Sequence, residues 1–137
     1  MPKINKTEDQ WRQELSEEQF YVLRKEGTER AFTSPLNDEK REGMFTCAGC
    51  GKPLFDAQTK FDSGTGWPSF YAPTEAENVT EHTDRRLFMK RTEVRCADCD
   101  GHLGHVFPDG PAPTGLRYCM NGAALQFDPS DDSDKDS

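Results

Sequence analysis

Two Cys-x-x-Cys pairs constrain this chain more than any other feature of its sequence. Cys47 and Cys50 lie in TCAGCGKPLF, and Cys96 and Cys99 lie in RCADCDGHLG. Each pair in a tight turn can direct two sulfur atoms at one ion, and two such turns complete a tetrahedron. Four sulfur ligands leave no open coordination position, so the spacing predicts one structural Zn²⁺ per chain. A thioredoxin-like redox pair and free thiols are the alternatives, and the presence of two pairs favours zinc.

The distance between the pairs indicates what the ion does for the fold. Residues 51–95 separate them, which is longer than the gap in a compact zinc ribbon. The chain has 137 residues, of which 33% are hydrophobic and 31% are charged. This length predicts one domain, and such a composition supplies a lean core. The ion is therefore expected to join two distant hairpins and to stabilise that core.

Charge and hydropathy exclude several partners. The formal net charge of -8 disfavours DNA or RNA as a partner, because phosphate binding needs clustered Lys and Arg. The acidic segment 128–137, DPSDDSDKDS, has little to bury and is predicted to be a disordered tail. No apolar leader and no run of about 18 apolar residues is found, so we expect neither secretion nor a membrane span. We expect a cytoplasmic monomer with reduced thiols.

The chain divides into a helical opening and a longer β region. Residues 7–26 are predicted to form two short helices, capped by Thr7 and Ser16, with Gly27 as a stop. From Met44 onward, glycines and prolines separate short apolar runs, which is typical of an antiparallel β domain. Residues 108–115, PDGPAPTG, are predicted to be the loop of a long hairpin.

The fifth cysteine, Cys119, has no partner pair. A lone cysteine is most often a small buried hydrophobic residue. In a strand over RYCMN, however, Arg117, Cys119 and Asn121 share one face, and Tyr118 and Met120 share the other. The face that carries the thiol is polar, and a nearby guanidinium favours the nucleophilic thiolate. Cys119 is therefore a candidate nucleophile.

Two histidines and a tryptophan are candidate partners of this thiol. His102 and His105 lie in HLGHVF, where the glycines disfavour a helix, and a hairpin with the RYCMN strand would bring them beside Cys119. The alternative is that each is an ordinary hydrogen-bonded residue of a strand. Trp67 lies in a Gly-Trp-Pro turn, which would present the indole at a cleft, although most tryptophans belong to the core.

Three segments together resemble one family. FDSGTGWPSF, RCADCDGHLGHVFPDGPAPTG and RYCMNGAALQF are similar to the signature segments of methionine sulfoxide reductase B, the peptide-methionine (R)-S-oxide reductases, in their zinc-containing branch. The resemblance implies a mainly β fold. The expected fold has two small, β-tent-like antiparallel sheets, which a zinc ion bound by four cysteines staples together. Short N-terminal helices are expected to pack outside them. It also implies a single reductase domain over 1–127, with its β core over 44–127.

The resemblance implies an activity and a role for each matching residue. The activity is the reduction of methionine (R)-sulfoxide, free or in proteins, through a sulfenic acid on the nucleophilic cysteine. The implied catalytic residues are Cys119 as nucleophile, His105 as main acid, His102 beside it, Asn121 orienting the substrate and the histidines, and Arg117 assisting electrostatically. The implied substrate-binding residues are Trp67, which receives the substrate methyl group, and Phe70.

The sequence departs from a common family pattern at Thr65. Many members have a cysteine there that closes a disulfide on the sulfenic acid. We therefore expect direct reduction by thioredoxin, glutaredoxin or a small thiol such as glutathione, the alternative being a route that borrows a zinc cysteine. Two rival functions stay open: a non-catalytic zinc-stapled β module that binds a peptide or small ligand in the Trp67 cleft, and a cysteine hydrolase.

Overall fold

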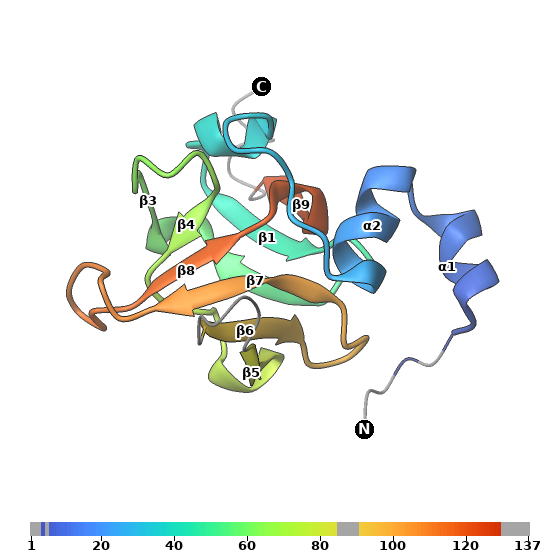
Figure 1. Ribbon diagram of the computed structural model, residues 1–137. Coiled ribbons are helices and arrows are strands. Elements are labelled where there is room, and N and C mark those ends of the chain that lie inside the picture. The colour runs from blue at the N-terminus through green and yellow to red at the C-terminus, as the bar shows by residue number, and fades with distance from the viewer. Residues whose placement is uncertain (1–3, 5, 85–90, 130–137) are drawn as a thin grey trace.

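Two short helices and two antiparallel sheets make up the protein. The computed structural model describes residues 4, 6–84 and 91–129. The helices lie together at one end of the molecule, outside both sheets (Figure 1). This is the mainly β architecture that the sequence predicted. No helix in the described part of the chain is long and apolar enough to cross a membrane.

The helices begin where the sequence predicted. α1 (Glu8–Glu14) and α2 (Glu17–Lys25) each start with a complete capping box. The side chains of Thr7 and Ser16 accept the backbone N–H of the glutamine three residues later, and that glutamine accepts the N–H of the cap. These bonds satisfy backbone donors that the first helical turn leaves unpaired.

The end of α2 differs slightly from the prediction. Glu26, not Gly27, adopts the left-handed conformation (φ 57°) at the C-cap. Gly27 follows it and packs under the ring of Tyr21, since a Cβ there would lie 2.2 Å from that ring and would displace it. The chain then leaves the helix in an irregular segment that crosses to the sheets.

The strands form a three-stranded and a six-stranded sheet. Their orders are β2-β1-β9 and β3-β4-β8-β7-β6-β5, with every described pair antiparallel. The bounds of the strands are β1 Gly43–Cys47, β2 Pro53–Asp56, β3 Lys60–Phe61, β4 Ser69–Phe70, β5 Val79–Asp84, β6 Arg91–Cys96, β7 His102–Phe107, β8 Arg117–Met120 and β9 Leu125–Pro129. Short 3₁₀ helices span Pro35–Asp38, Ala57–Thr59, Ala76–Asn78 and Gly122–Ala124.

Aromatic rings fill the space between the two sheets. Phe55 of β2 stacks on Phe70 of β4 with their centroids 4.4 Å apart. Phe45 of β1 meets the Phe70 ring edge-on, with the centroids 5.0 Å apart, and the centroid of Tyr118 of β8 lies 5.7 Å from that of Phe55. Each of these side chains is buried. Because the rings come from both sheets, their packing holds one sheet against the other.

The last described strand runs past the predicted edge of the domain. In β9, Asp128 pairs with Met44 and Pro129 pairs with Gly43. Strand pairing thus continues two residues beyond position 127, where the β core was expected to end. The remainder of the predicted acidic tail, residues 130–137, lies outside the described residues.

The β7–β8 hairpin lies inside the larger sheet, and its loop, residues 108–116, contains the predicted segment 108–115. Gly104 of β7 pairs with Met120 of β8. A Cβ at Gly104 would lie 2.1 Å from the backbone oxygen of Cys119, so only glycine permits this approach. The glycine that disfavoured a helix in HLGHVF therefore fixes the spacing of the two strands that carry the candidate catalytic residues.

Candidate active site and metal centre

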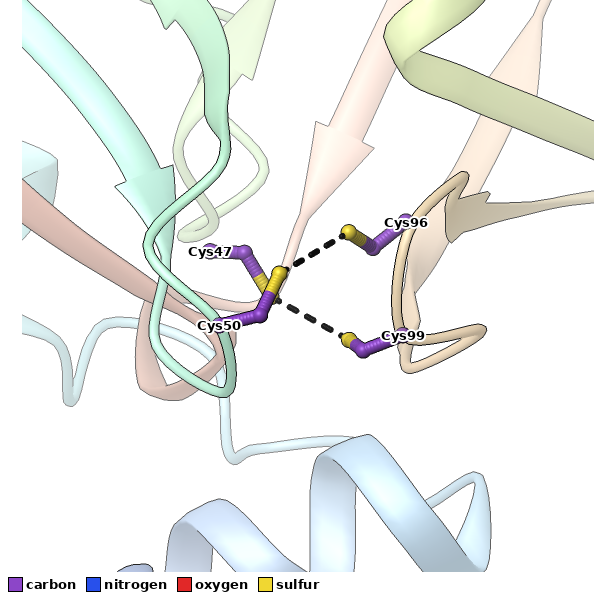
Figure 2. A group of neighbouring side chains, drawn as sticks. All are labelled: Cys47, Cys50, Cys96 and Cys99. Carbon is purple, nitrogen blue, oxygen red and sulfur yellow. Dashed lines mark hydrogen bonds between the residues drawn. The ribbon is translucent and has the colours of Figure 1, made fainter. Parts of the chain in front are cut away.

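The four paired cysteines meet between the two sheets. Cys47 ends β1 of the smaller sheet and Cys50 lies in the turn after it, while Cys96 ends β6 of the larger sheet and Cys99 lies in the turn after it. Figure 2 shows the sulfur atoms of one turn facing those of the other. All four Sγ atoms lie within 4.8 Å of one another. The cluster therefore connects the sheets, as the spacing predicted.

The geometry of this cluster fits a tetrahedral ion. The Sγ atoms of Cys47 and Cys99 lie 3.6 Å apart, and those of Cys50 and Cys96 lie 3.5 Å apart. Ligands at about 2.3 Å in a tetrahedron would be separated by about 3.8 Å. Hydrogen bonding among the four thiols lowers the pKa of Cys50 and Cys96 and raises the pKa of Cys47 and Cys99. A bound cation would favour the thiolate form of all four. The site can hold one metal ion.

The N-terminal helices cover this cluster. The guanidinium of Arg24 donates a hydrogen bond to the backbone oxygen of Cys99 at 2.8 Å and lies over the ring of Trp11 at 4.6 Å. Gly49, inside the first turn, approaches the same indole, because a Cβ there would lie 3.4 Å from it. The cluster is thus closed by protein on the helical side, as expected of a structural site.

The fifth cysteine lines a separate cavity on the larger sheet. The cavity has a volume of about 150 Å³. It is lined by Thr28, Trp67, Arg91, Gly104, His105, Phe107, Arg117, Cys119, Met120 and Asn121. His105 and Cys119 are directly paired across β7 and β8. Directly opposite residues project to the same face with Cβ atoms about 5 Å apart, so the imidazole and the thiol are neighbours.

Burial and polar partners act on the Cys119 thiol in opposite directions. Burial raises its pKa, while Thr65, Arg117 and Ser69 lower it, and the net direction is upward. Arg117 thus favours the thiolate, as the sequence predicted, but desolvation of the charged form outweighs this effect. Thr65 Oγ1 lies 3.9 Å from Cys119 Sγ.

A group of hydroxyls extends from this sulfur. The Oγ of Ser63 lies 2.7 Å from Thr65 Oγ1 and 2.7 Å from the Oγ of Ser69. Ser69 is in turn paired with Cys119 across β4 and β8. The thiol thus has hydroxyl groups on one side and an imidazole on the other.

Arg117 is anchored by a carboxylate that the sequence analysis did not identify. Its Nε and Nη2 donate to the two carboxylate oxygens of Asp109, at 2.8 and 3.2 Å, and its guanidinium stacks 4.5 Å from the centroid of Phe107. The hydrogen bond to Asp109 raises the pKa of Arg117. Asp109 lies in the loop between β7 and β8. The predicted hairpin is the sequence feature that could have placed this residue near Arg117, at the start of β8.

The two histidines have different surroundings. His105 lines the cavity, whereas the Nδ1 of His102 lies 2.7 Å from a carboxylate oxygen of Glu93 on β6. Glu93 is buried, and burial opposes its ionisation, but hydrogen bonds from Arg95 and His102 outweigh this effect and lower its pKa. The rings of His102 and His105 meet edge to face, 5.5 Å apart. His102 thus contacts His105 and does not line the cavity.

Asn121 and Trp67 are connected through the backbone of one residue. The amide oxygen of Asn121 accepts the backbone N–H of Glu29, and its amide nitrogen donates to the backbone oxygen of Leu103. The backbone oxygen of Glu29 accepts the indole N–H of Trp67 at 2.9 Å. Asn121, expected to orient the substrate and the histidines, makes its hydrogen bonds to these two backbone segments.

Glu29 also binds with its side chain. One carboxylate oxygen accepts the backbone N–H of Ala123 at 2.8 Å, and the side chain is buried. Burial raises the pKa of this carboxyl. Neither Glu29 nor Glu93 lies in a spaced motif, and the contacts that matter here, with Ala123 and with His102, form only when the strands and loops pack, so the sequence did not indicate them.

Phe70 does not belong to the cavity. It is fully buried among the rings between the sheets. In β4 it pairs with Tyr118, which is on the core side of β8, whereas its neighbour Ser69 pairs with Cys119. Strand alternation therefore directs Phe70 away from the thiol. Of the residues expected at this site, the structure brings Trp67, His105, Arg117, Cys119 and Asn121 together.

Comparison with known proteins agrees with this arrangement. The SelR domain matches residues 15–129. A peptide methionine sulfoxide reductase MsrB of Agrobacterium fabrum is 55% identical over 128 residues, which cover 93% of this chain and 95% of the relative. A protein of the same name from Pseudomonas putida strain GB-1 is 59% identical over 131 residues, covering 96% and 100% of the two chains. One from Thiobacillus denitrificans is 59% identical over 126 residues, covering 92% and 96%.

Proposed function

The chain belongs to the SelR family and is a peptide-methionine (R)-S-oxide reductase of the MsrB type, and we propose that Cys119 is its nucleophile and His105 its acid–base residue. One observation carries this assignment: His105 and Cys119 are paired across β7 and β8 and line a cavity that Trp67 also lines. A thiol, an imidazole and an aromatic wall are the groups that reduction of a methyl sulfoxide requires.

The raised pKa of Cys119 gives His105 two tasks. Burial favours the protonated thiol in the free protein. His105 takes this proton as Sγ attacks the sulfoxide sulfur, and the imidazolium then gives it to the sulfoxide oxygen. An S–S bond forms while the S–O double bond becomes a single bond to a hydroxyl group. Arg117 stabilises the negative charge that develops on Sγ during the attack.

The second half of the step completes the electron balance. The hydroxyl passes to Sγ, the S–S bond breaks, and methionine leaves. One oxygen atom has moved from the substrate to Cys119, which becomes a sulfenic acid. The substrate sulfur gains two electrons and Cys119 loses two. The thiol proton ends on the sulfenic hydroxyl, so no further reactant is needed for this half-reaction.

Other cavity residues hold the reacting groups in place. The indole of Trp67 receives the substrate methyl group by dispersion, and its hydrogen bond to Glu29 fixes the plane of the ring. Asn121 holds the same Glu29 backbone, so it positions the wall. The ring of His102, held by Glu93, packs on the edge of His105 and orients it.

The sulfenic acid is reduced by an external thiol. Thr65 occupies the position next to Cys119 Sγ where a second thiol would close a disulfide, and a threonine hydroxyl cannot do so. We infer that thioredoxin, glutaredoxin or a small thiol attacks the sulfenic sulfur directly. We propose that the enzyme acts as a monomer on free or protein-bound substrate.

The sulfur cluster holds zinc. Cys47, Cys50, Cys96 and Cys99 are the ligands, and the donor set of four sulfurs in a closed setting is the one that structural Zn²⁺ favours. When bound, the ion cross-links the two sheets and takes no part in sulfoxide chemistry. Four reduced thiols and a thiol-dependent reaction both suit a reducing compartment, and we place the protein in the cytoplasm.

Two measurements test these assignments. The wild-type protein, with dithiothreitol as reductant, is expected to reduce the R epimer of methionine sulfoxide and to leave the S epimer unchanged. One turnover without reductant is expected to make Cys119 about 16 Da heavier and reactive toward dimedone, as for one added oxygen. A product about 2 Da lighter, with an internal disulfide, would overturn the direct-reduction route.

The rival binding module makes a different prediction. A non-catalytic zinc-stapled domain that binds a ligand in the Trp67 cleft would turn over neither epimer, whatever the reductant. It also gives no reason for an imidazole opposite the Cys119 thiol or for a carboxylate that anchors Arg117.

A further inference from the structure

Phe32 is an outlier on the described surface. Its side chain is 75% exposed, against 54% for the exposed aromatic Tyr21. Its backbone is left-handed, with φ at 66°. Neither condition suits a bulky apolar residue, since the left-handed region crowds its Cβ and exposure leaves its ring in water. Strain of this kind is retained mainly at functional sites.

The segment around Phe32 is attached to the Trp67 turn. The backbone N–H of Phe32 donates to the backbone oxygen of Gly66 at 2.7 Å, and the side-chain amide of Asn37 donates to the same oxygen at 2.8 Å. A Cβ at Gly66 would lie 2.7 Å from the Phe32 ring, so this glycine makes room for it. The ring is therefore held next to the residue that precedes Trp67.

A groove runs from Phe32 to Trp67. Its volume is about 450 Å³, three times the volume of about 150 Å³ at Cys119. Phe32, Ala57, Phe61, Trp67 and Pro68 supply its apolar surface, and charged side chains supply much of the rest, namely Asp38, Glu39, Lys40, Lys60 and Asp62. Trp67 also lines the Cys119 cavity, so the two spaces share this residue.

The difference in size indicates what the groove binds. A cavity of about 150 Å³ can take a methionine side chain, but not the polypeptide that carries it. When an oxidised methionine of a protein enters, its neighbouring residues must lie across the rim. The groove shares Trp67 with the cavity and offers apolar and charged side chains to these neighbouring residues.

We propose that this groove binds the residues flanking methionine sulfoxide in a protein substrate, with the Phe32 ring packing on their apolar side chains. The proposal rests on the proposed function of the Cys119 site and adds a preference among its substrates. Phe32 is then a specificity residue outside the reacting centre. Its left-handed backbone conformation directs the ring toward the groove in which the peptide binds.

A comparison of two substrates tests the proposal. Free methionine (R)-sulfoxide is compared with a peptide that has one central methionine (R)-sulfoxide flanked by leucines, with dithiothreitol as reductant. In Phe32→Asn the ring is removed, and asparagine tolerates the left-handed backbone. We expect kcat/KM for the peptide to fall about tenfold, the scale of a partly buried aromatic contact, through a higher KM. For free methionine sulfoxide, kcat/KM is expected to stay within about twofold.

Matched variants make the result specific. Phe32→Tyr keeps the ring and should retain peptide turnover, while Tyr21→Ser removes an exposed aromatic that does not line the groove and should change neither substrate. Equal losses on both substrates, or no loss on the peptide, would overturn the proposal. So would a defect seen only when thioredoxin replaces dithiothreitol, because the groove would then bind the reductant. A wild type inactive on both substrates would instead refute the function of the Cys119 site.

Discussion

The cysteines of this molecule occupy two sites, and the surroundings of the two differ in almost every respect. At the junction of the sheets, the Sγ atoms of four cysteines lie within 4.8 Å of one another, closed in by the N-terminal helices. At the β7–β8 hairpin, one sulfur faces a cavity, with hydroxyls, an imidazole and a guanidinium around it. In the first arrangement, all four sulfur atoms are placed to bind one metal ion. In the second, one sulfur atom faces a cavity where it can react. Environment, and not residue type, separates a structural thiol from a reactive one.

The largest expected effect falls on the reactive sulfur alone. Cys119→Ser should lower turnover of methionine (R)-sulfoxide by about 1,000-fold or more, because a hydroxyl is a far weaker nucleophile toward sulfur. Zinc content and thermal midpoint should match the wild type, since Cys119 is not a member of the cluster. Epimer-resolved kinetics and metal analysis check both parts. Retained turnover in this variant would remove Cys119 from the mechanism.

The opposite substitution should separate the sites in the other direction. Cys47→Ser removes a buried cluster ligand and is expected to release zinc and to lower the free energy of unfolding by about 4 kcal/mol. Urea denaturation with metal analysis measures the change, and a chelator applied to the wild type should reproduce it. Ala97→Ser, inside the second turn but not a ligand, is the control. A stable and zinc-free Cys47→Ser would show that the cluster does not support the fold.

The same contrast explains how much the sequence could predict. The cluster follows from local spacing, because a Cys-x-x-Cys turn contains half of the site within four residues. Capped helices and strand alternation are local as well, so α1, α2 and the polar face of β8 could be predicted. The Cys119 cavity draws on the loop after α2, the Trp67 turn, β7 and β8, which meet only through tertiary packing.

The residues that were missed or misassigned follow from that difference. Three carboxylates were missed because no spaced motif links them to their partners, which they meet only in the folded chain. The pairs are Asp109 with Arg117, Glu93 with His102, and Glu29 with Ala123. Phe70 was expected to bind substrate because it lies within GWPSF, but the β4–β8 register places it opposite Tyr118 in the core. The raised pKa of Cys119 was also not predictable, since desolvation depends on packing around the thiol.

A third substitution would give the reactive site the thiol pair that it lacks. Thr65 Oγ1 and Cys119 Sγ are 3.9 Å apart, so Thr65→Cys should place a thiol within reach of the sulfenic acid. One turnover without reductant is then expected to yield an internal disulfide, about 2 Da lighter, in place of the added oxygen. Intact-mass measurement distinguishes the products, and peptide mapping then locates the disulfide. Thr59→Cys is a control away from the cavity. Persistence of the sulfenic acid in Thr65→Cys would mean that the two positions do not approach each other in solution.

The smallest effect concerns the charge that opposes burial at Cys119. Burial raises the pKa of this thiol, and Arg117 works against that rise. The wild-type rate of alkylation by iodoacetamide should therefore increase with pH to a midpoint above the ordinary value for a thiol. Arg117→Met removes a cation that stabilises the thiolate, so its midpoint should move higher and its rate at neutral pH should fall. Arg12→Met, a substitution of an exposed arginine on α1, should leave the profile unchanged. A midpoint that falls in Arg117→Met would mean that the guanidinium does not favour the thiolate, because its ion pair with Asp109 neutralises its charge.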